Sequence, residues 1–133
     1  MERNSRQRSA MLEALAASKR ALTPPELCEM AQVEVPSLNL STVYRRLKDL
    51  VDDGEVLRVE LPGQPTRFER AFDDAVRDVH HHHFHCNACD RVYPIHACPG
   101  PMKNLAPRGF RVEGHEIMLH GRCASCGPAR VGR

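Results

Sequence analysis

The sequence predicts an α+β protein whose helices come first and whose short strands follow. Residues 1–70 carry the apolar spacing of helices and contain one cysteine and no histidine. All eight histidines and five of the six cysteines lie from His80 onward, where the apolar runs have the length of short strands. We therefore expect three parts: a helical domain over residues 1–70, a hinge over 71–79 and a metal-binding domain over 80–133.

Three helices are expected in the first part. The first runs from about Ser5 to Ser18, with apolar residues at helical spacing: Met11, Leu12 and Leu15. The second starts at residues 23–26, Thr-Pro-Pro-Glu, where a hydroxyl N-cap precedes proline and an early acid. The third starts near Ser41 and Thr42 and ends by Gly54, and its buried stripe has the spacing i, i+4, i+7 and i+8: Val43, Leu47, Leu50 and Val51.

A β-hairpin is expected directly after these helices. Its strands are residues 56–61 and 66–69, and the connecting Pro-Gly-Gln-Pro at 62–65 has the composition of a turn. Three helices followed by a two-stranded hairpin is the layout of a winged helix-turn-helix. Further strands are expected in the second domain at residues 82–86, 91–95 and, longer, 110–120, with room for a short helix between 99 and 106.

Bulk composition narrows the function classes. The chain has 133 residues, a formal net charge of +2 and 5% aromatic residues, with no tryptophan. A small domain with few large apolar side chains often needs a metal or a partner subunit for stability. The sequence has no apolar run of membrane-spanning length and no signal-peptide pattern. We therefore expect a cytoplasmic protein with reduced thiols, in which paired cysteines bind metal.

Metal ligands are concentrated in the run His80–Cys89, which holds five imidazoles and two thiols. Its CxxC pair, Cys86 and Cys89, is matched by a second pair near the C-terminus, Cys123 and Cys126. Two such turns complete a tetrahedral zinc site with four cysteine ligands, and two redox pairs are the alternative. Cys28, alone on the second helix, is expected to be a small buried residue.

Strand alternation divides the histidines of this run into two sets. Neighbouring side chains of a strand point to opposite faces, so His81 and His83 share one face and His80 and His82 share the other. One strand could thus serve two different metals. His85 falls on the face of His81 but lies next to the four-cysteine site, and we expect it to be a bystander.

The third helix has the features of a DNA-recognition helix. Side chains off its buried stripe could reach base edges and phosphates: Ser41, Thr42, Tyr44, Arg45, Arg46 and Lys48. An ordinary solvated face is the alternative, since Asp49 and Asp52 lie further along the helix. The helix order and basic residues in the expected places favour DNA: Arg58, Arg67 and Arg70 in the wing and Arg3, Arg6 and Arg8 in an N-terminal arm.

The segment 40–47, Leu-Ser-Thr-Val-Tyr-Arg-Arg-Leu, followed by Leu50, Gly54 and Val56, closely resembles the recognition-helix signature of the ferric uptake regulator (Fur) family. The pattern His-His-x-His-x-x-Cys-x-x-Cys and the terminal CxxC are similar to the metal-binding half of the same family. The resemblance covers nearly the whole chain and is strongest to the zinc uptake regulator branch. It implies a dimeric, metal-dependent transcriptional repressor whose C-terminal half dimerises, with Tyr44 on bases and Arg45 on phosphates.

The resemblance also implies two ligand sets beside the structural four-cysteine zinc. On the hinge side, Glu69 would join His81 and His83. Iron-type members have a further histidine where this chain has Ala21, so the fourth ligand is open among Asp73, Asp74, Asp78 and water. In the second site, the ligands would be His80, His82 and His115, completed by His96 or Cys98 in place of a carboxylate. Imidazole and thiolate ligands favour zinc over iron or manganese.

We therefore predict a zinc-responsive repressor that binds operator DNA as a homodimer and controls metal-uptake genes. Its cofactor would be structural and regulatory Zn²⁺, in preference to Fe²⁺ or Mn²⁺. An iron- or peroxide-responsive member of the same family is one alternative, and a zinc buffer or chaperone, which would not need a winged helix, is another. An enzyme is not expected, because the sequence has no HExxH or deaminase-type pattern.

Overall fold

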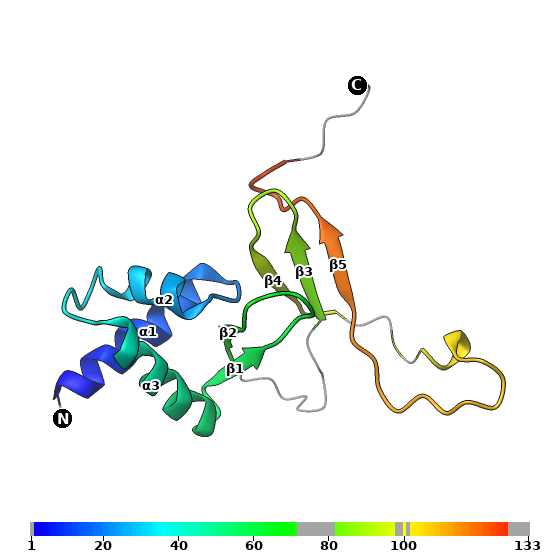
Figure 1. Cartoon of the computed structure of the whole chain (residues 1–133), viewed down its shortest axis with the longest axis horizontal. Helices are drawn as coiled ribbons and strands as arrows, with labels where there is room; N and C mark the ends of the chain where they lie inside the picture. The colour runs from blue at the N-terminus through cyan, green and yellow to red at the C-terminus, as the bar shows by residue number, and fades with distance from the viewer. Residues whose placement is uncertain (1, 72–81, 98–99, 101, 128–133) are drawn as a thin grey trace. The chain divides into compact units, whose positions relative to one another are not determined.

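The computed structural model describes residues 2–71, 82–97, 100 and 102–127, and the chain divides into two compact units, residues 1–73 and 74–133. Figure 1 shows helices and a hairpin in the first unit and a three-stranded sheet in the second. Residues 72–79 of the expected hinge lie outside the described residues, as do His80, His81 and Cys98. No helix within the described ranges is long and apolar enough to cross a membrane.

The first unit contains three helices in the predicted order: α1 (Glu2–Ser18), α2 (Pro24–Ala31) and α3 (Leu40–Asp52). The predicted start of α2 is confirmed, because Thr23 Oγ1 accepts a hydrogen bond from the Glu26 N–H at 3.3 Å while Glu26 Oε1 accepts one from the Thr23 N–H at 2.9 Å. Helix α3 begins at Leu40, one residue before the predicted start near Ser41 and Thr42. Its N-cap is Asn39, whose Oδ1 accepts a hydrogen bond from the Thr42 N–H at 2.9 Å.

Helix α3 is held by the apolar core of the first unit. This core includes residues of all three helices and of the hairpin: Met11, Leu15, Leu22, Leu27, Val43, Leu47, Leu50, Val56 and Phe68. Full burial of one such side chain contributes about 1.5–3 kcal/mol. The predicted stripe of α3 is thus buried except for Val51, which packs at the margin of the core. The opposite face of α3 is consequently presented to solvent.

The hairpin consists of β1 (Val56–Val59) and β2 (Arg67–Arg70), which pair antiparallel with Arg58 opposite Phe68. It is fastened to the helical core by two backbone hydrogen bonds between Leu22 and Phe68, each 2.8 Å long. Phe68 also lies in the core itself. The hairpin therefore has the place of a wing beside α3, and the predicted α+β class is confirmed.

The second unit is built on a sheet of order β4-β3-β5: β3 (His82–Cys86), β4 (Val92–Ile95) and β5 (Met118–Gly121). Strand β4 pairs antiparallel with β3, whereas β5 pairs parallel with it. One short 3-10 helix, η1 (Lys103–Leu105), lies in the connection from β4 to β5. The predicted first two strands of this domain are confirmed.

The predicted long strand over residues 110–120 is wrong, because only Met118–Gly121 is a strand. Gly109, with a φ of 89°, precedes the segment, and Gly114 interrupts it. Phe110 is 71% exposed, so the alternation of apolar residues does not mark a buried face here. His115 accordingly lies before the strand and not within it.

Candidate metal centre and nucleic-acid interface

Four cysteine thiols meet in the second unit, where the two CxxC turns come together. Cys86 Sγ lies 3.7 Å from Cys126 Sγ, and Cys89 Sγ lies 3.8 Å from Cys123 Sγ. All four sulfur atoms lie within 4.8 Å of one another. Thiolates around a tetrahedral zinc at ~2.3 Å are ~3.8 Å apart, whereas a disulfide needs ~2.05 Å. The predicted cluster is therefore assembled at the spacing that zinc requires.

The sheet explains why these turns meet. Cys86 ends β3, and β5 runs parallel beside it, with Gly121 opposite Cys86. The second CxxC therefore starts where the first one starts. Backbone hydrogen bonds fix both turns: Asn87 N–H to Gly121 O at 2.7 Å, Asp90 N–H to Cys86 O at 2.8 Å and Cys126 N–H to Cys123 O at 3.1 Å.

Electrostatics favour thiolates at two of the four positions. Burial acts to raise the pKa of Cys86, but N–H donors of Cys123, Cys89 and Ala88 outweigh it and lower the pKa to about 6. A backbone N–H of Cys126 lowers the pKa of Cys123. The Cys126 thiol hydrogen-bonds Cys123 and Cys86, which raises its own pKa to about 12. Bound zinc would have to displace the remaining thiol protons.

The structure brings together two residues of the predicted second metal site, His82 and His115. Their rings stack with centroids 5.1 Å apart, and His82 is buried. His82 Nδ1 accepts a hydrogen bond from the Ile117 N–H at 3.0 Å. A neutral imidazole that accepts at Nδ1 carries its proton on Nε2, so ligation by His82 requires this arrangement to change.

Three further candidate ligands of this second site were predicted, and one of them, His96, lies among the described residues. His96 is exposed just beyond the end of β4, while His80 and Cys98 lie outside the described residues. His115 lines a hollow together with two acids, Glu113 and Glu116. These carboxylates were not predicted, although their position on either side of His115 was a usable signal.

The hinge-side set is divided between the two units. Glu69 is buried in β2, opposite Leu57, and His83 is half-buried in β3, opposite Met118 of β5. His81 lies outside the described residues. This ligand set therefore stays a prediction. Ala21, where the resemblance implies a histidine in iron-type members, is fully buried.

His85, expected as a bystander, has a specific partner in the structure. Its Nε2 lies 2.6 Å from Asp90 Oδ1, and the residue is only 9% exposed. On the second turn, the Arg122 guanidinium donates hydrogen bonds to Gly127 O at 2.9 Å and to Cys126 O at 3.1 Å. These roles of the flanking residues were not predicted, although each residue lies directly beside a CxxC pair.

Helix α3 exposes the centre of the predicted DNA-binding face. Tyr44 is 54% exposed, and Ser41 and Arg45 are also exposed. Thr42 is buried, and its Oγ1 accepts a hydrogen bond from Arg45 Nη2 at 3.2 Å. Thr42 therefore orients Arg45 and does not itself face solvent.

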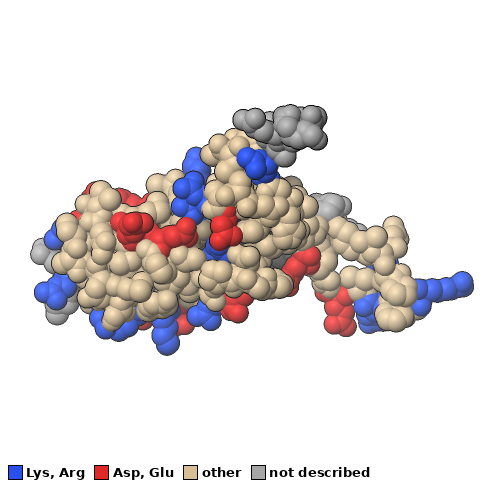
Figure 2. Space-filling model, turned by 45° about the horizontal axis from the view of Figure 1, so that its top comes forward, with Lys and Arg blue, Asp and Glu red and all other residues tan. Residues whose placement is uncertain are grey.

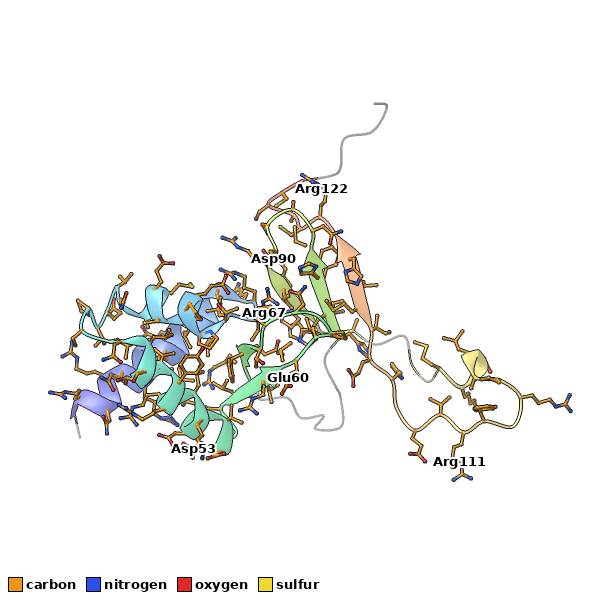
Figure 3. The ribbon with its side chains drawn as sticks, in the orientation of Figure 1. Asp53, Glu60, Arg67, Asp90, Arg111 and Arg122 are labelled. Atoms are coloured by element: carbon orange, nitrogen blue, oxygen red, sulfur yellow. The ribbon has the colours of Figure 1, made fainter. Side chains whose placement is uncertain are left out.

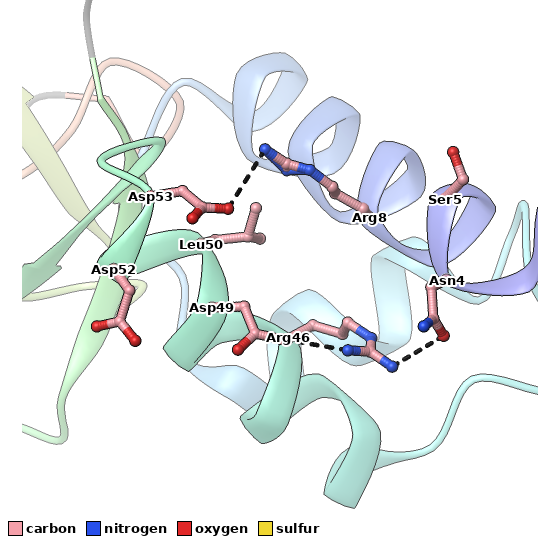
Figure 4. A pocket seen from close by; sticks show the side chains of 8 residues that line it. All are labelled: Asn4, Ser5, Arg8, Arg46, Asp49, Leu50, Asp52 and Asp53. Atoms are coloured by element: carbon pink, nitrogen blue, oxygen red, sulfur yellow. Dashed lines mark hydrogen bonds and ion pairs between the residues drawn. The ribbon is translucent and has the colours of Figure 1, made fainter. Parts of the chain in front are cut away.

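Arg46, also predicted to bind DNA, is held against helix α1. Its guanidinium donates to Asn4 Oδ1 at 2.9 Å, to Gln7 Oε1 at 3.4 Å and to Asp49 Oδ2 at 3.2 Å. Figure 4 shows the Arg46 side chain between Asn4 and Asp49 in the hollow that separates α1 from α3. Arg46 thus braces the two helices against each other, and its charge is already compensated by Asp49.

Several other basic side chains of the first unit are also engaged. Arg70 Nη1 donates to Glu55 Oε1 at 2.7 Å, and Arg8 lies 3.6 Å from the same carboxylate group. Arg58 stays exposed on the wing, with its guanidinium 5.8 Å from the centre of the Phe68 ring. Figure 2 shows basic side chains along the lower edge of this unit. Within its described residues, the exposed arginines are Arg3, Arg6, Arg45 and Arg58.

This fold and residue pattern recur in known proteins. Residues 2–120 match the Ferric uptake regulator family. The chain is 30% identical to a ferric uptake regulation protein of Campylobacter jejuni over 129 residues, 92% of this chain and 78% of that protein. It is 27% identical to the peroxide operon regulator of Bacillus subtilis over 124 residues, 90% of this chain and 81% of that protein. A solved zinc-bound manganese uptake regulator has the same fold, with a TM-score of 0.69 and 24% identity over 88% of this chain and 87% of that one.

The thiol pKa values predict how zinc binding at the four-cysteine site depends on pH. Protons compete with zinc for thiolates, so the apparent affinity should rise with pH. The pKa of Cys86 is about 6, so below that pH one more proton must be displaced for each zinc bound. Competition with a chromogenic chelator at a series of pH values should give a plot of log affinity that steepens below about pH 6. An unchanged slope across that pH would contradict the lowered pKa.

Replacing Cys123 by Ser should abolish zinc binding at this site and destabilise the second unit, because a hydroxyl is a poor zinc ligand. The matched control is Cys28→Ser, which changes a buried thiol in the first unit. Cobalt-loaded protein should show the charge-transfer absorption of four thiolates with the control and a much weaker one with Cys123→Ser. A Cys123→Ser protein that kept the full absorption and the wild-type thermal stability would refute the structural role.

Proposed function

Because this chain belongs to the ferric uptake regulator family, we propose that it is a zinc-responsive transcriptional repressor, which binds operator DNA as a dimer and controls metal-uptake genes. The observation that carries the proposal is the combination of parts in one chain. A winged helix with an exposed, arginine-bearing α3 is joined to a unit with a cluster of four cysteines and a stacked histidine pair. A zinc buffer or a metalloenzyme would have no use for the first of these units.

On this proposal, the exposed face of α3 enters the major groove of the operator. Tyr44 and Ser41, near the start of the helix, would face base edges, as the early residues of recognition helices do. Arg45, oriented by Thr42, and Arg58 on the wing would contact phosphates. Arg46 supports this face from behind, through its contacts to α1.

Dimerisation through the second unit is supported by its exposed apolar side chains. Phe110 is 71% exposed and Leu105 80% exposed, and Leu119 on β5 is 49% exposed. Large apolar side chains exposed on a small unit are typical of a protein–protein interface. A two-fold symmetric dimer would place two copies of α3 on the two halves of a palindromic operator.

The regulatory response is assigned to Glu69, His81 and His83. Glu69 precedes the segment that joins the two units, and His81 and His83 follow it in the sequence. Ligands on either side of this segment would favour one arrangement of the units when metal is bound, and this is what a metal-dependent switch requires. When bound there, zinc would supply the positive charge that holds these groups together. His82 and His115 form the basis of the second site.

Zinc is proposed as the signal because the ligand candidates are mostly imidazoles and thiols. An iron- or peroxide-responsive regulator, acting in the cytoplasm on the same kind of operator, is the second candidate. It is favoured by the similarity to the Campylobacter and Bacillus proteins, which are named for those responses.

Operator binding titrated against buffered free zinc, iron and manganese distinguishes these candidates. For each metal, the free concentration that promotes operator binding is compared with the free concentration of that metal in the cell. We expect this ratio to be lowest for zinc. The variant with His81→Ala and His83→Ala should lose this response while it keeps its fold, and His120→Ala, an exposed histidine of the same unit, should keep it. A response to iron below any physiological zinc threshold would favour the second candidate. Zinc-dependent binding by the double variant would exclude the proposed switch ligands.

The salt dependence of operator binding should distinguish Arg45 from Arg46. Loss of one phosphate contact lowers the slope of log affinity against log salt concentration by about 0.9. Arg45→Ala removes one such contact from each subunit of the proposed dimer and should show twice this decrease, whereas Arg46→Ala should keep the wild-type slope and instead lower the thermal stability of the first unit. An equal loss of slope in both variants would contradict the bracing role of Arg46.

A further inference from the structure

In both CxxC turns, the residue directly before the cysteine pair contacts the residue directly after it. On the first turn, His85 precedes Cys86 and contacts Asp90, which follows Cys89: His85 Nε2 lies 2.6 Å from Asp90 Oδ1. On the second turn, Arg122 precedes Cys123 and donates from Nε to the carbonyl of Gly127, which follows Cys126, at 2.9 Å. In both turns, therefore, the residue before the pair is hydrogen-bonded to the residue after it.

The two turns also agree in backbone conformation at the residue after the cysteine pair. Asp90 and Gly127 both have positive φ angles, of 63° and 74°. Glycine adopts this left-handed conformation freely, whereas an L-residue with a Cβ is strained there, and aspartate is one of the few that tolerate it. At the first turn this strained position is occupied by a residue whose carboxylate accepts a hydrogen bond that glycine could not accept.

The His85 imidazole is held by neighbours in addition to Asp90. His85 is 9% exposed and lies in β3 opposite His120 of β5, whose ring packs edge-on at 5.9 Å. A buried donor with one defined acceptor loses much of its hydrogen-bond energy if that acceptor is removed. On the second turn, Arg122 makes two hydrogen bonds with one planar guanidinium, to Cys126 O as well as to Gly127 O.

We propose that these two pairs, His85–Asp90 and Arg122–Gly127, are clasps that hold the CxxC turns closed and slow the release of zinc from the four-cysteine site. The metal leaves such a site by stepwise exchange of thiolates for water or chelator, and each exchange requires a turn to open. A clasp makes this opening less favourable, so His85, Asp90 and Arg122 are positioning residues. The inference rests on zinc occupancy of the four-cysteine site, as proposed above.

The test measures metal release from the full-length protein loaded with cobalt. All variants and the wild-type reference carry Cys98→Ser, which removes the one thiol among the candidate ligands of the second site. Thiolate-to-cobalt charge-transfer absorption then reports the four-cysteine site, and its decay after addition of excess chelator gives the release rate. The informative pair is Asp90→Gly, which relaxes the backbone but removes the clasp, and Asp90→Asn, which keeps an acceptor and tolerates the left-handed conformation. Arg122→Ala tests the second clasp, and Arg111→Ala, an exposed arginine of the same unit, is the matched control (Figure 3).

We expect Asp90→Gly and Arg122→Ala to release cobalt roughly three- to tenfold faster than wild type, the effect of one net hydrogen bond. Asp90→Asn and Arg111→Ala should remain within about twofold of wild type, by the same measure. In a His85→Leu background, Asp90→Gly should have no additional effect, because the two residues act as one pair. Circular dichroism of the loaded variants checks that each has folded.

Release from Asp90→Gly at or below the wild-type rate would overturn the proposal, because backbone strain would then outweigh the clasp. Equal acceleration by Asp90→Gly and Asp90→Asn would overturn it as well, since the hydrogen bond would not be the cause. If wild-type protein forms no thiolate-to-cobalt absorption at all, the four-cysteine site itself is refuted, and the clasps with it. These outcomes separate failure of the clasp from failure of the metal site.

Discussion

The attraction between a divalent cation and four thiolates is the interaction on which the second unit depends, because its described residues bury little apolar surface. Val92 is the one aliphatic side chain among them that is fully buried, and the other buried residues are sulfur- or imidazole-bearing: Cys86, Cys123, His82 and His85. The apolar cluster that holds the three helices lies entirely in the first unit. A metal of this kind contributes folding free energy directly, so it takes the place of a hydrophobic core.

The two units are stabilised in different ways, one by an apolar core and the other by a metal cluster, and this separates stability from sensing. The first unit places α3 by ordinary packing, through residues such as Leu47 and Leu50, and so keeps the surface proposed to face DNA formed without metal. The second unit joins its first strand to its last through the four-cysteine cluster, and β3 also carries His83, one of the histidines proposed as sensors. A structural metal that leaves slowly allows a second, weaker metal to report concentration without unfolding the unit that binds it.

Much of this architecture could be predicted from the sequence, because it depends on local periodicity and on paired ligands. The helices followed from apolar spacing, and the four-cysteine cluster followed from two CxxC pairs. The N-cap of α3 was not predicted, because Asn39, Ser41 and Thr42 are all good capping residues and only the backbone decides among them. Residues 110–117 alternate like a strand, yet none of them belongs to one. The hydrogen bond from Arg122 to Gly127 O could not be predicted, since every residue has a backbone carbonyl and the sequence does not distinguish one from another.

The parallel pairing of β3 with β5 has one more consequence. Both CxxC turns lie at the same end of the sheet, so the chain between β4 and β5 leaves the sheet and returns to it without passing between the cysteines. Its length and composition are therefore free to change without disturbing the metal cluster. Insertions, deletions and substitutions in this connection, including changes to the acids around His115, could alter the metal selectivity of the sensor. The four-cysteine site would stay intact.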